Sequence, residues 1–320
     1  EAPFTLYGLK WEASQSTYRR LPANTDGEIP PKVDRHADAP AGGQIHFATD
    51  SQDVWIRASM SQQRFRHQGT PVSTYGFDVY KREDDIYRFL GTTRMKRDEL
   101  TYTSEIMLQD EAEMNAFVIN MPLFNPMDSI EIGVSEGSRI ELSTPFEGKP
   151  PVVIYGTSIV HGSAASRPGM AYPSILSRML DREVVNLGFA GSARGELKMA
   201  DLLNEIPGKG LIILDMEANT HDKLKEVLEP FIERIRSKDT TTPILVLSRI
   251  HLTRDALSEW KTRRKELTQF QVNLVQKFRD AGDDKIFFMD GRELIDEEWK
   301  WDATVDGTHP NDLGFSMMAK

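Results

Sequence analysis

The sequence predicts an α/β protein in two parts. The first part, residues 1–147, is expected to be an antiparallel β-sandwich, and the second, residues 148–320, a three-layer α/β/α domain. In the first part, apolar and polar residues alternate with a period of two. The second part contains short, nearly continuous apolar runs separated by helical patterns. A proline-rich connection from Ser143 to Pro151 lies between the two patterns, so we place the boundary there.

Strand patterns fill the first part. In residues 54–60, every second residue is apolar and would face a core. Shorter alternations recur at residues 45–47, 77–79 and 130–134, and turn-rich breaks occur at residues 41–43, 49–51 and 68–71. Short alternating strands at this spacing are typical of an antiparallel β-sandwich. We find no convincing helix in this part and no repeat of fixed period.

Five apolar runs of strand length follow the connection. They cover residues 152–155, 184–187, 211–214, 244–247 and 286–289. Such runs suit parallel strands that are buried on both faces. Helical spacing separates them, most clearly at 172–180 and at 267–278, where we expect the helix to end near Gly282. This alternation predicts a doubly wound sheet of five parallel strands with helices on both faces.

The composition excludes several classes of function. The 39 basic and 49 acidic residues give a formal charge of −10, which disfavours nucleic-acid binding. The one basic cluster, Lys261 to Lys265, is better explained as the solvated side of a helix. The chain has no cysteine, so disulfides, thiolate nucleophiles and cysteine metal sites are excluded. No apolar stretch reaches the roughly 18 residues that a membrane span needs.

The ends of the sequence bear on its processing. It begins at Glu1 rather than at methionine, so we expect that an export signal or a tag was removed. This feature favours a secreted or periplasmic protein, with a cytoplasmic location left open. Lys320 ends the sequence inside an expected helix, so part of the native tail is expected to be missing. The sequence indicates no oligomeric state.

Glycine-rich and polar segments follow the predicted parallel strands. The carboxyl ends of parallel strands meet at one edge of a sheet, so we expect these segments to converge there. They are residues 156–158 after the first strand, 186–191 after the second, 215–219 after the third, and 306–309 well after the fifth.

These segments contain the groups of a serine nucleophile site. A serine hydroxyl becomes a nucleophile when a base takes its proton, and His309 is the candidate base for Ser158. Asp306 lies three residues before His309, so it can accept from one ring nitrogen and stabilise the imidazolium. The backbone N–H groups of Ser158 and Gly191 and the side-chain amide of Asn219 would then stabilise a tetrahedral oxyanion.

At these segments the sequence resembles the SGNH (GDSL-type) serine hydrolase superfamily. Its four motif blocks occur in order between Pro151 and the end of the chain, at residues 156–158, 186–191, 219 and 306–309. The resemblance implies a flavodoxin-like domain and a serine esterase mechanism without metal or cofactor. By position, it implies that the nucleophile is Ser158, the base His309, its partner Asp306, and the oxyanion hole Ser158, Gly191 and Asn219.

Two positions depart from the family pattern, and one further motif extends the resemblance. Thr157 replaces the common aspartate before the serine. Glu217 replaces a common glycine two residues before the asparagine, where a carboxylate could crowd or recharge the pocket. The first part resembles the small β domain, expected to be jelly-roll-like, that precedes one subgroup of these hydrolases. The resemblance rests on Gly76 to Tyr80, which match its Gly-x-Asp-[Leu/Val]-Tyr motif.

The leading hypothesis is an esterase that removes short acyl groups, with acetyl on a carbohydrate favoured. The expected partner is therefore a small-molecule or carbohydrate ester, with no nucleic acid and no membrane span. Two alternatives stay open. One is a carbohydrate-binding protein with a degenerate hydrolase domain, which Glu217 favours because its charge would oppose an oxyanion. The other is an acyltransferase that uses the same serine.

The other histidines have simpler interpretations. His221, which Asp222 follows, is a rival base but is better explained as the start of a helix. His161 and His251 lie near strand ends and could contact substrate. The remaining three, His36, His46 and His67, lack metal-ligand spacing, so no zinc site is predicted.

Overall fold

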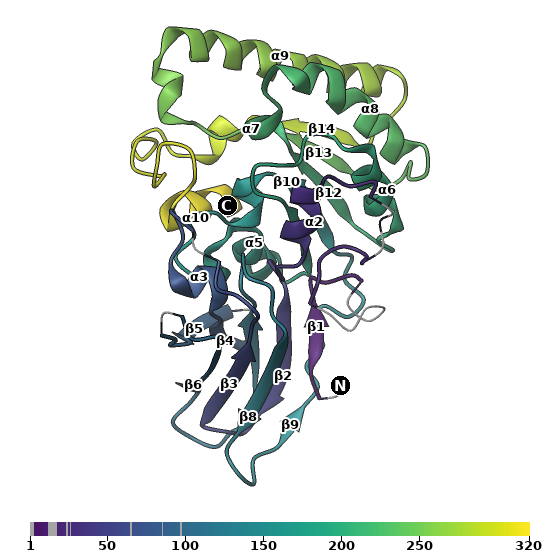
Figure 1. The fold of residues 1–320 in the computed structure, drawn as a ribbon. Helices are drawn as coiled ribbons and strands as arrows, with labels where there is room; N and C mark the ends of the chain where they lie inside the picture. Colours follow the sequence, from purple (N-terminus) through teal and green to yellow (C-terminus); the bar gives the residue numbers. More distant parts are fainter. Residues whose placement is uncertain are drawn as a thin grey trace.

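The computed structural model describes residues 3–11, 18–23, 25, 27–64, 66–84, 86–96 and 98–320. Antiparallel strands occupy the lower half of Figure 1, and a parallel sheet between helices occupies the upper half. The α/β fold class with a preceding antiparallel part, as predicted from the sequence, is confirmed.

Two antiparallel sheets pack face to face in the first part. One contains, in this order, β1 (Thr5–Tyr7), β2 (Gln44–Thr49), β7 (Asn115–Asn120), β4 (Asp78–Glu83) and β5 (Ile86–Thr92), with β9 (Ile140–Glu141) beside β2. The other contains β6 (Thr101–Met107), β3 (Asp53–Ser59) and β8 (Ser129–Val134). Phe47 of the first sheet and Ile56 of the second share one buried core, as in a β-sandwich. The jelly-roll description stays a prediction.

The expectation of no helix in the first part is wrong. α2 (Pro31–Ala37) and α3 (Pro71–Tyr75) both begin with a proline, which the first helical turn tolerates. They have 7 and 5 residues, so neither is long enough to show a repeated apolar spacing in the sequence. Val33 and Ala37 of α2 instead pack into a core of the second part.

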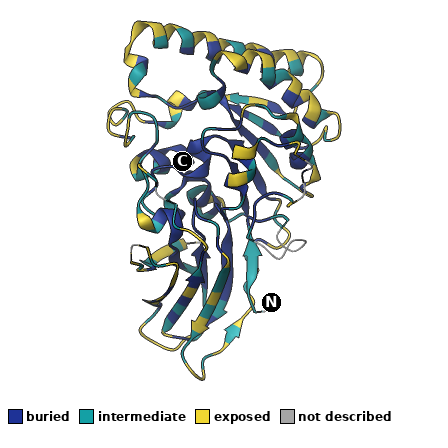
Figure 2. Ribbon diagram, viewed as in Figure 1, coloured by how far each residue is buried: buried dark blue, intermediate teal, exposed yellow. Residues whose placement is uncertain are grey.

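The second part is built on a five-stranded parallel sheet. Its strands are β10 (Val152–Gly156), β11 (Val184–Gly188), β12 (Leu211–Asp215), β13 (Ile244–Leu247) and β14 (Ile286–Met289). Their order, β11-β10-β12-β13-β14, is that of flavodoxin-like sheets. Every residue of β10 and β11 is buried, and Figure 2 shows this sheet mostly in dark blue. Burial on both faces explains why the sequence shows continuous apolar runs here.

Helices cover both faces of the parallel sheet. One face packs against α6 (Leu197–Glu205), α8 (Leu224–Arg236) and α9 (Ser258–Asp280). The other packs against α4 (Ser158–His161), α5 (Tyr172–Leu180) and α10 (Asp312–Ala319). The connections contain α7 (Glu217–Thr220), η1 (Pro168–Met170), η2 (His221–Lys223), η3 (Thr253–Ala256) and η4 (Gly291–Leu294). In the parts of the chain that the structure describes, no helix has the length and apolarity needed to cross a bilayer.

Arg20 ties the N-terminal segment to the parallel sheet. Its side chain is almost fully buried. The guanidinium donates to the backbone oxygens of Asn186 at 3.0 Å and Gly188 at 2.7 Å in β11. It also donates to those of His36 at 2.7 Å and Ala39 at 2.9 Å. Burial lowers the pKa of Arg20 to about 9, so the group is still charged at neutral pH.

The segment around α2 therefore belongs to both parts of the molecule. Leu21, Ile29 and Val33 lie in the same core as the helices above the parallel sheet. The division of the chain into domains 1–147 and 148–320 stays a prediction. If the chain were cut there, this core would lose the apolar residues that the first 147 positions supply.

We expect Arg20→Gln to lower the free energy of unfolding by about 3 kcal/mol, because the shorter side chain leaves buried carbonyl oxygens without donors. Arg57→Gln is the matched control, since the Arg57 side chain is 60% exposed on β3. Its effect should stay within about 0.5 kcal/mol. Urea unfolding measures both, and equal stabilities of the two variants would contradict the role of Arg20.

Candidate active site

Ser158 lies at a tight turn between β10 and α4. It is the first residue of α4, and Thr157 caps the helix by accepting from the N–H of Ile159. A Cβ on Gly156 would overlap Val160 Cγ2 and the backbone oxygen of Asp215, so the turn needs glycine. The turn places Ser158 at the carboxyl edge of the sheet, where the side chain is 9% exposed.

The predicted serine, histidine and aspartate lie within hydrogen-bond distance of one another. Ser158 Oγ is 2.9 Å from His309 Nε2. His309 Nδ1 is 2.8 Å from Asp306 Oδ2. With Nδ1 donating to the carboxylate, Nε2 is the nitrogen that can accept the serine proton. Asp306 Oδ1 also accepts from the backbone N–H of Thr308 at 3.0 Å and of His309 at 2.8 Å, which fixes the carboxylate.

Gln68, from the loop before α3, also contacts this carboxylate. Gln68 Nε2 donates to Asp306 Oδ2 at 3.0 Å, so the first part of the chain reaches the site. Burial raises the pKa of Asp306, but hydrogen bonds from His309 and Gln68 outweigh it and lower the pKa to about 2. The carboxylate is therefore ionised at every pH above about 3.

Two backbone donors at this edge are unused. No described residue accepts a hydrogen bond from the N–H of Ser158 or of Gly191. Asn219 Nδ2 donates one hydrogen to the backbone oxygen of Ser192 at 2.7 Å, which orients the amide and leaves its second hydrogen available. All three of these groups line the same pocket. Together they can supply donors to one oxyanion.

His161 supports the loop that contains Gly191. It is fully buried, and its Nδ1 accepts from the N–H of Ala190 at 3.3 Å. Its Nε2 lies 2.6 Å from the backbone oxygen of Leu123 in the first part. Burial, and then the charge of Arg20, hold the pKa of His161 well below its usual range. His161 is thus a neutral bridge between the two parts and does not line the pocket.

Glu217 does not reach the pocket. Its side chain is completely buried and forms an ion pair with Arg249 at 3.2 Å. It also accepts from the N–H of Arg249 at 3.1 Å and from Gln271 Nε2 at 2.9 Å. The sequence suggests that this carboxylate could crowd or recharge the pocket. In the structure it does neither, because it lies away from the space in front of Ser158.

The pocket in front of Ser158 has a volume of about 570 Å³. His36 and His221 line it as well as His309. The Asp222 carboxylate accepts hydrogen bonds from Arg263, with a shortest contact of 2.5 Å, and so does not orient His221 as Asp306 orients His309. Burial, and then the charge of Arg254, lower the pKa of His221. Among the described residues, His309 forms an ion pair with a carboxylate and His221 does not. Among the described residues, no group of three or more His, Asp or Glu side chains could hold a metal ion.

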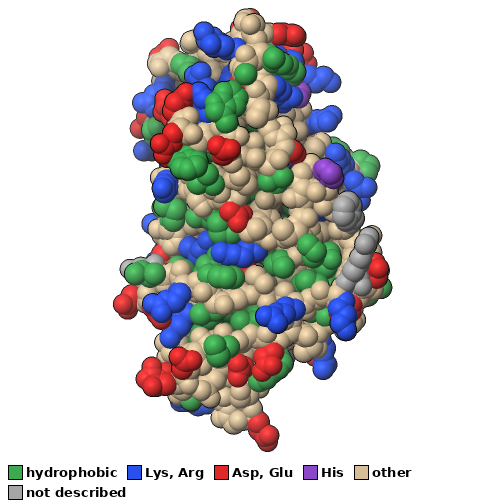
Figure 3. All heavy atoms as spheres, turned by 90° about the vertical axis from the view of Figure 1, so that its left-hand side faces the viewer, with side chains coloured by type: hydrophobic (Ala, Val, Ile, Leu, Met, Phe, Trp, Pro, Cys, Tyr) green, Lys and Arg blue, Asp and Glu red, His purple; other side chains and the backbone are tan. Residues whose placement is uncertain are grey.

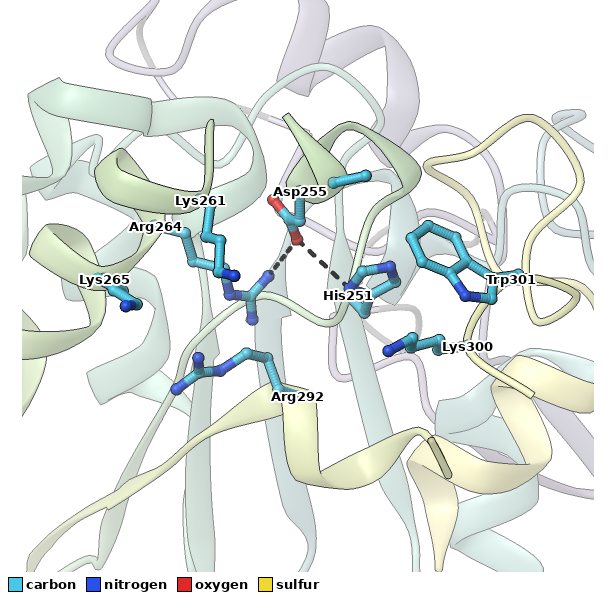
Figure 4. A pocket seen from close by; sticks show the side chains of 9 residues that line it. His251, Asp255, Lys261, Arg264, Lys265, Arg292, Lys300 and Trp301 are labelled. Carbon is cyan, nitrogen blue, oxygen red and sulfur yellow. Dashed lines mark hydrogen bonds and ion pairs between the residues drawn. The ribbon is translucent and has the colours of Figure 1, made fainter. Parts of the chain in front are cut away.

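A second cavity, of about 280 Å³, is shown in Figure 4. Lys261, Lys265 and Trp301 line it, as does His251, which lies 3.9 Å from Asp255. No serine or threonine lines this cavity, so it offers no hydroxyl nucleophile. His251 therefore lies apart from the serine site.

In the predicted basic cluster, Lys261 and Lys265 are exposed as expected, but Arg264 between them is buried.

The sequence analysis missed several residues of the Ser158 pocket. Gln68, Lys32 and Arg254 all line it. Gln68 lies in a segment that the sequence predicts only as a turn, and Lys32 lies in α2, a helix that the sequence did not predict. No local pattern distinguishes these side chains from exposed polar residues, because their position depends on contacts between distant parts of the chain.

Two family models match the chain. A model of the GDSL-like Lipase/Acylhydrolase family matches residues 149–320. A model described as the N-terminus of Esterase_SGNH_hydro-type matches residues 1–140. No curated protein matched the sequence.

Solved structures share the whole architecture. A protein from Bacteroides ovatus named as a GDSL-like lipase has 28% identity and a TM-score of 0.88, covering 98% of this chain and 92% of its own. The salicylyl-acyltransferase SsfX3 from a tetracycline biosynthetic pathway has 20% identity and a TM-score of 0.78, covering 100% and 92%. A family two carbohydrate esterase from Clostridium thermocellum has 11% identity and a TM-score of 0.61, covering 87% and 90%. The last two show a shared fold alone.

We expect Gln68→Leu to raise the pKa of Asp306 from about 2 towards its usual range, because the ionised form loses a hydrogen bond. The stabilisation that this depressed pKa provides is present above the pKa of the unfolded state. In the variant it would be lost at a higher pH as the solution is acidified. Carbon-13 NMR of the carboxyl group measures the midpoint. Gln63→Leu is the control, since Gln63 donates to the backbone of Glu99 instead. An unchanged midpoint in Gln68→Leu would contradict this role.

Proposed function

The chain belongs to the GDSL-like Lipase/Acylhydrolase family of ester hydrolases, and on that premise we propose that it is a serine esterase acting on short-chain esters, with acetyl groups on a carbohydrate as the substrate. The observation that carries this proposal is the hydrogen-bonded series from Asp306 through His309 to Ser158, with contacts of 2.8 and 2.9 Å. No metal or cofactor takes part in the proposed mechanism.

The proposed reaction has two halves. Ser158 Oγ attacks the ester carbonyl while His309 Nε2 takes its proton, and Asp306 stabilises the imidazolium. The carbonyl oxygen becomes an oxyanion that accepts from the N–H groups of Ser158 and Gly191 and from Asn219. His309 then gives the proton to the leaving alcohol oxygen, which leaves an acyl group on Ser158. In the second half, His309 takes a proton from a water molecule whose oxygen attacks the acyl carbon. The bond between that carbon and Ser158 Oγ then breaks, His309 returns the proton to Oγ, and the acid is released.

The lining of the pocket supports a short acyl group and a hydrophilic alcohol. Apart from Ala190 and Ala218, its side chains are polar or charged, so the pocket offers no long apolar groove. A long acyl chain would have to lose water contacts without burying against apolar surface, which removes the usual driving force for lipid binding. An acetyl group needs little apolar surface, and a sugar can use the polar side chains for hydrogen bonds.

The two alternatives differ in their support. The hypothesis of a binding protein with a degenerate hydrolase domain depended on Glu217, and that side chain is paired with Arg249 away from the pocket. An acyltransferase would form the same acyl group on Ser158 and pass it to a sugar hydroxyl instead of water. Product analysis in the presence of sugar acceptors separates transfer from hydrolysis.

We expect Ser158→Ala to reduce hydrolysis of 4-nitrophenyl acetate by at least about 1000-fold in kcat, because the nucleophile is lost. Ser237→Ala is the matched control, since Ser237 lies at the end of α8 and donates to the backbone of Arg234. Both variants should keep the circular dichroism spectrum of the parent protein. Full activity of Ser158→Ala would require another nucleophile and would contradict the proposal.

A further inference from the structure

The pocket in front of Ser158 is lined by cations and by no carboxylate. Its permanent charges are Lys32 and Arg35 of α2, Arg66 of the loop before α3, and Arg254 of η3. Since the chain as a whole carries a charge of −10, this set is opposite in sign to the rest of the protein. Figure 3 shows acidic and basic side chains mixed over one face of the molecule.

These four cations have no acidic partner within the described parts of the chain. None of the described carboxylates forms an ion pair with any of them. Arg66 donates to Ser163 Oγ at 3.0 Å and lies 3.9 Å above the ring of Phe124. Arg254 lies 4.2 Å above the ring of Trp260. Neutral contacts of this kind hold the two guanidinium groups in place without an ion pair to a carboxylate.

Several other arginines that are buried or half-buried pair with a carboxylate. Arg167 pairs with Asp78 at 2.9 Å, and Arg236 pairs with Asp283 at 2.6 Å. In the second cavity, shown in Figure 4, Arg264 pairs with Asp255 at 3.0 Å. A half-buried cation without a carboxylate loses hydration free energy, and a bound anion would offset that loss. Arg66 and Arg254 are half-buried and therefore have the environment of a binding site for an anion, whereas Lys32 and Arg35 are exposed at the same pocket.

The positions of two of the cations place this anion beside the ester. Lys32 Nζ lies so close to Gly191 that a Cβ on that glycine would overlap it, so the ammonium is next to the proposed oxyanion hole. Arg254 lines the same pocket, and its buried Nε contacts no acceptor among the described residues. Burial and then the nearby cations lower the pKa of His36 to about 3, so this lining residue adds no charge of its own at neutral pH.

We propose that the alcohol half of the ester substrate carries an anionic oxygen group, a carboxylate, sulfate or phosphate, which Lys32, Arg35, Arg66 and Arg254 bind. An acetyl group has no charge, so the anion must belong to the alcohol, as in an acidic sugar. The volume of about 570 Å³ has room for such a ring beside the acetyl group. This inference rests on the proposed esterase function.

The test compares two probes that differ in charge, 4-acetoxybenzoate and its neutral methyl ester. Each is an acetate ester, and kcat/KM is measured for both with the full-length protein. The ratio of the anionic to the neutral value reports charge recognition, because any general change in the catalytic groups cancels. We expect Lys32→Gln and Arg254→Gln each to lower this ratio roughly tenfold, mainly through KM for the anionic probe. Raising sodium chloride from about 0.05 to about 0.5 M should lower the ratio for the parent protein.

Lys261→Gln is the matched control. It removes the same charge from an exposed position at the second cavity, so it should leave the ratio within about twofold. If both probes are hydrolysed but neither the two variants nor salt changes the ratio, the inference is wrong while the esterase function stands.

If neither probe is hydrolysed, the proposed function fails, and binding then decides the inference. Calorimetry would compare tetragalacturonate with cellotetraose on the parent protein and on Arg254→Gln. Binding of the acidic sugar alone, weakened in the variant, would support an anion site. Equal binding of both sugars, or of neither, would overturn it.

Discussion

The carboxyl ends of parallel strands meet at one edge of a sheet, and the candidate active site depends on this constraint. β10 ends at Gly156, so the chain must turn there, and the turn places Ser158 at the edge. His309 is 151 residues further along the chain, yet its ring lies 2.9 Å from the serine oxygen. Gly191 reaches the same point from the neighbouring strand β11. No local interaction could bring these groups together, whereas a buried five-stranded sheet does so by its connectivity.

The first part of the chain completes this edge. Arg20 holds the segment before β2 against the end of β11, and His161 joins Leu123 to the loop that contains Gly191. From the same side, Gln68 contacts the carboxylate of Asp306, and Lys32 lies against Gly191. The β-sandwich and α2 are therefore a wall of the pocket as well as a neighbour of the α/β unit. Variation in this wall is a physical route by which proteins of this architecture could differ in the alcohol that they accept.

Much of the fold follows from the sequence because its strands are buried on both faces. The run at 152–155 is continuous and apolar, the run at 184–187 is interrupted only by Asn186, and each lies within a strand of the sheet. The helices α2 and α3 are too short to show a period, so the same reasoning missed them. Their position is set by proline at the start and by packing against distant residues.

Some residues of the candidate site could be predicted from the sequence, and others could not. The contact between Asp306 and His309 is local, so their spacing of three residues predicted it. The sequence around Gln68 and around Arg254 is typical of an exposed polar segment, and only tertiary contacts bring these two side chains to the pocket. Glu217 is the reverse case: its position near Asn219 suggested a charge in the pocket, but its carboxylate is buried and pairs with Arg249.

The most direct test of the account is to label the folded protein with a fluorophosphonate and map the modified residue by mass spectrometry. The account predicts a single adduct on Ser158 that disappears in His309→Ala, and a labelled residue elsewhere, with Ser158 unmodified, would contradict it.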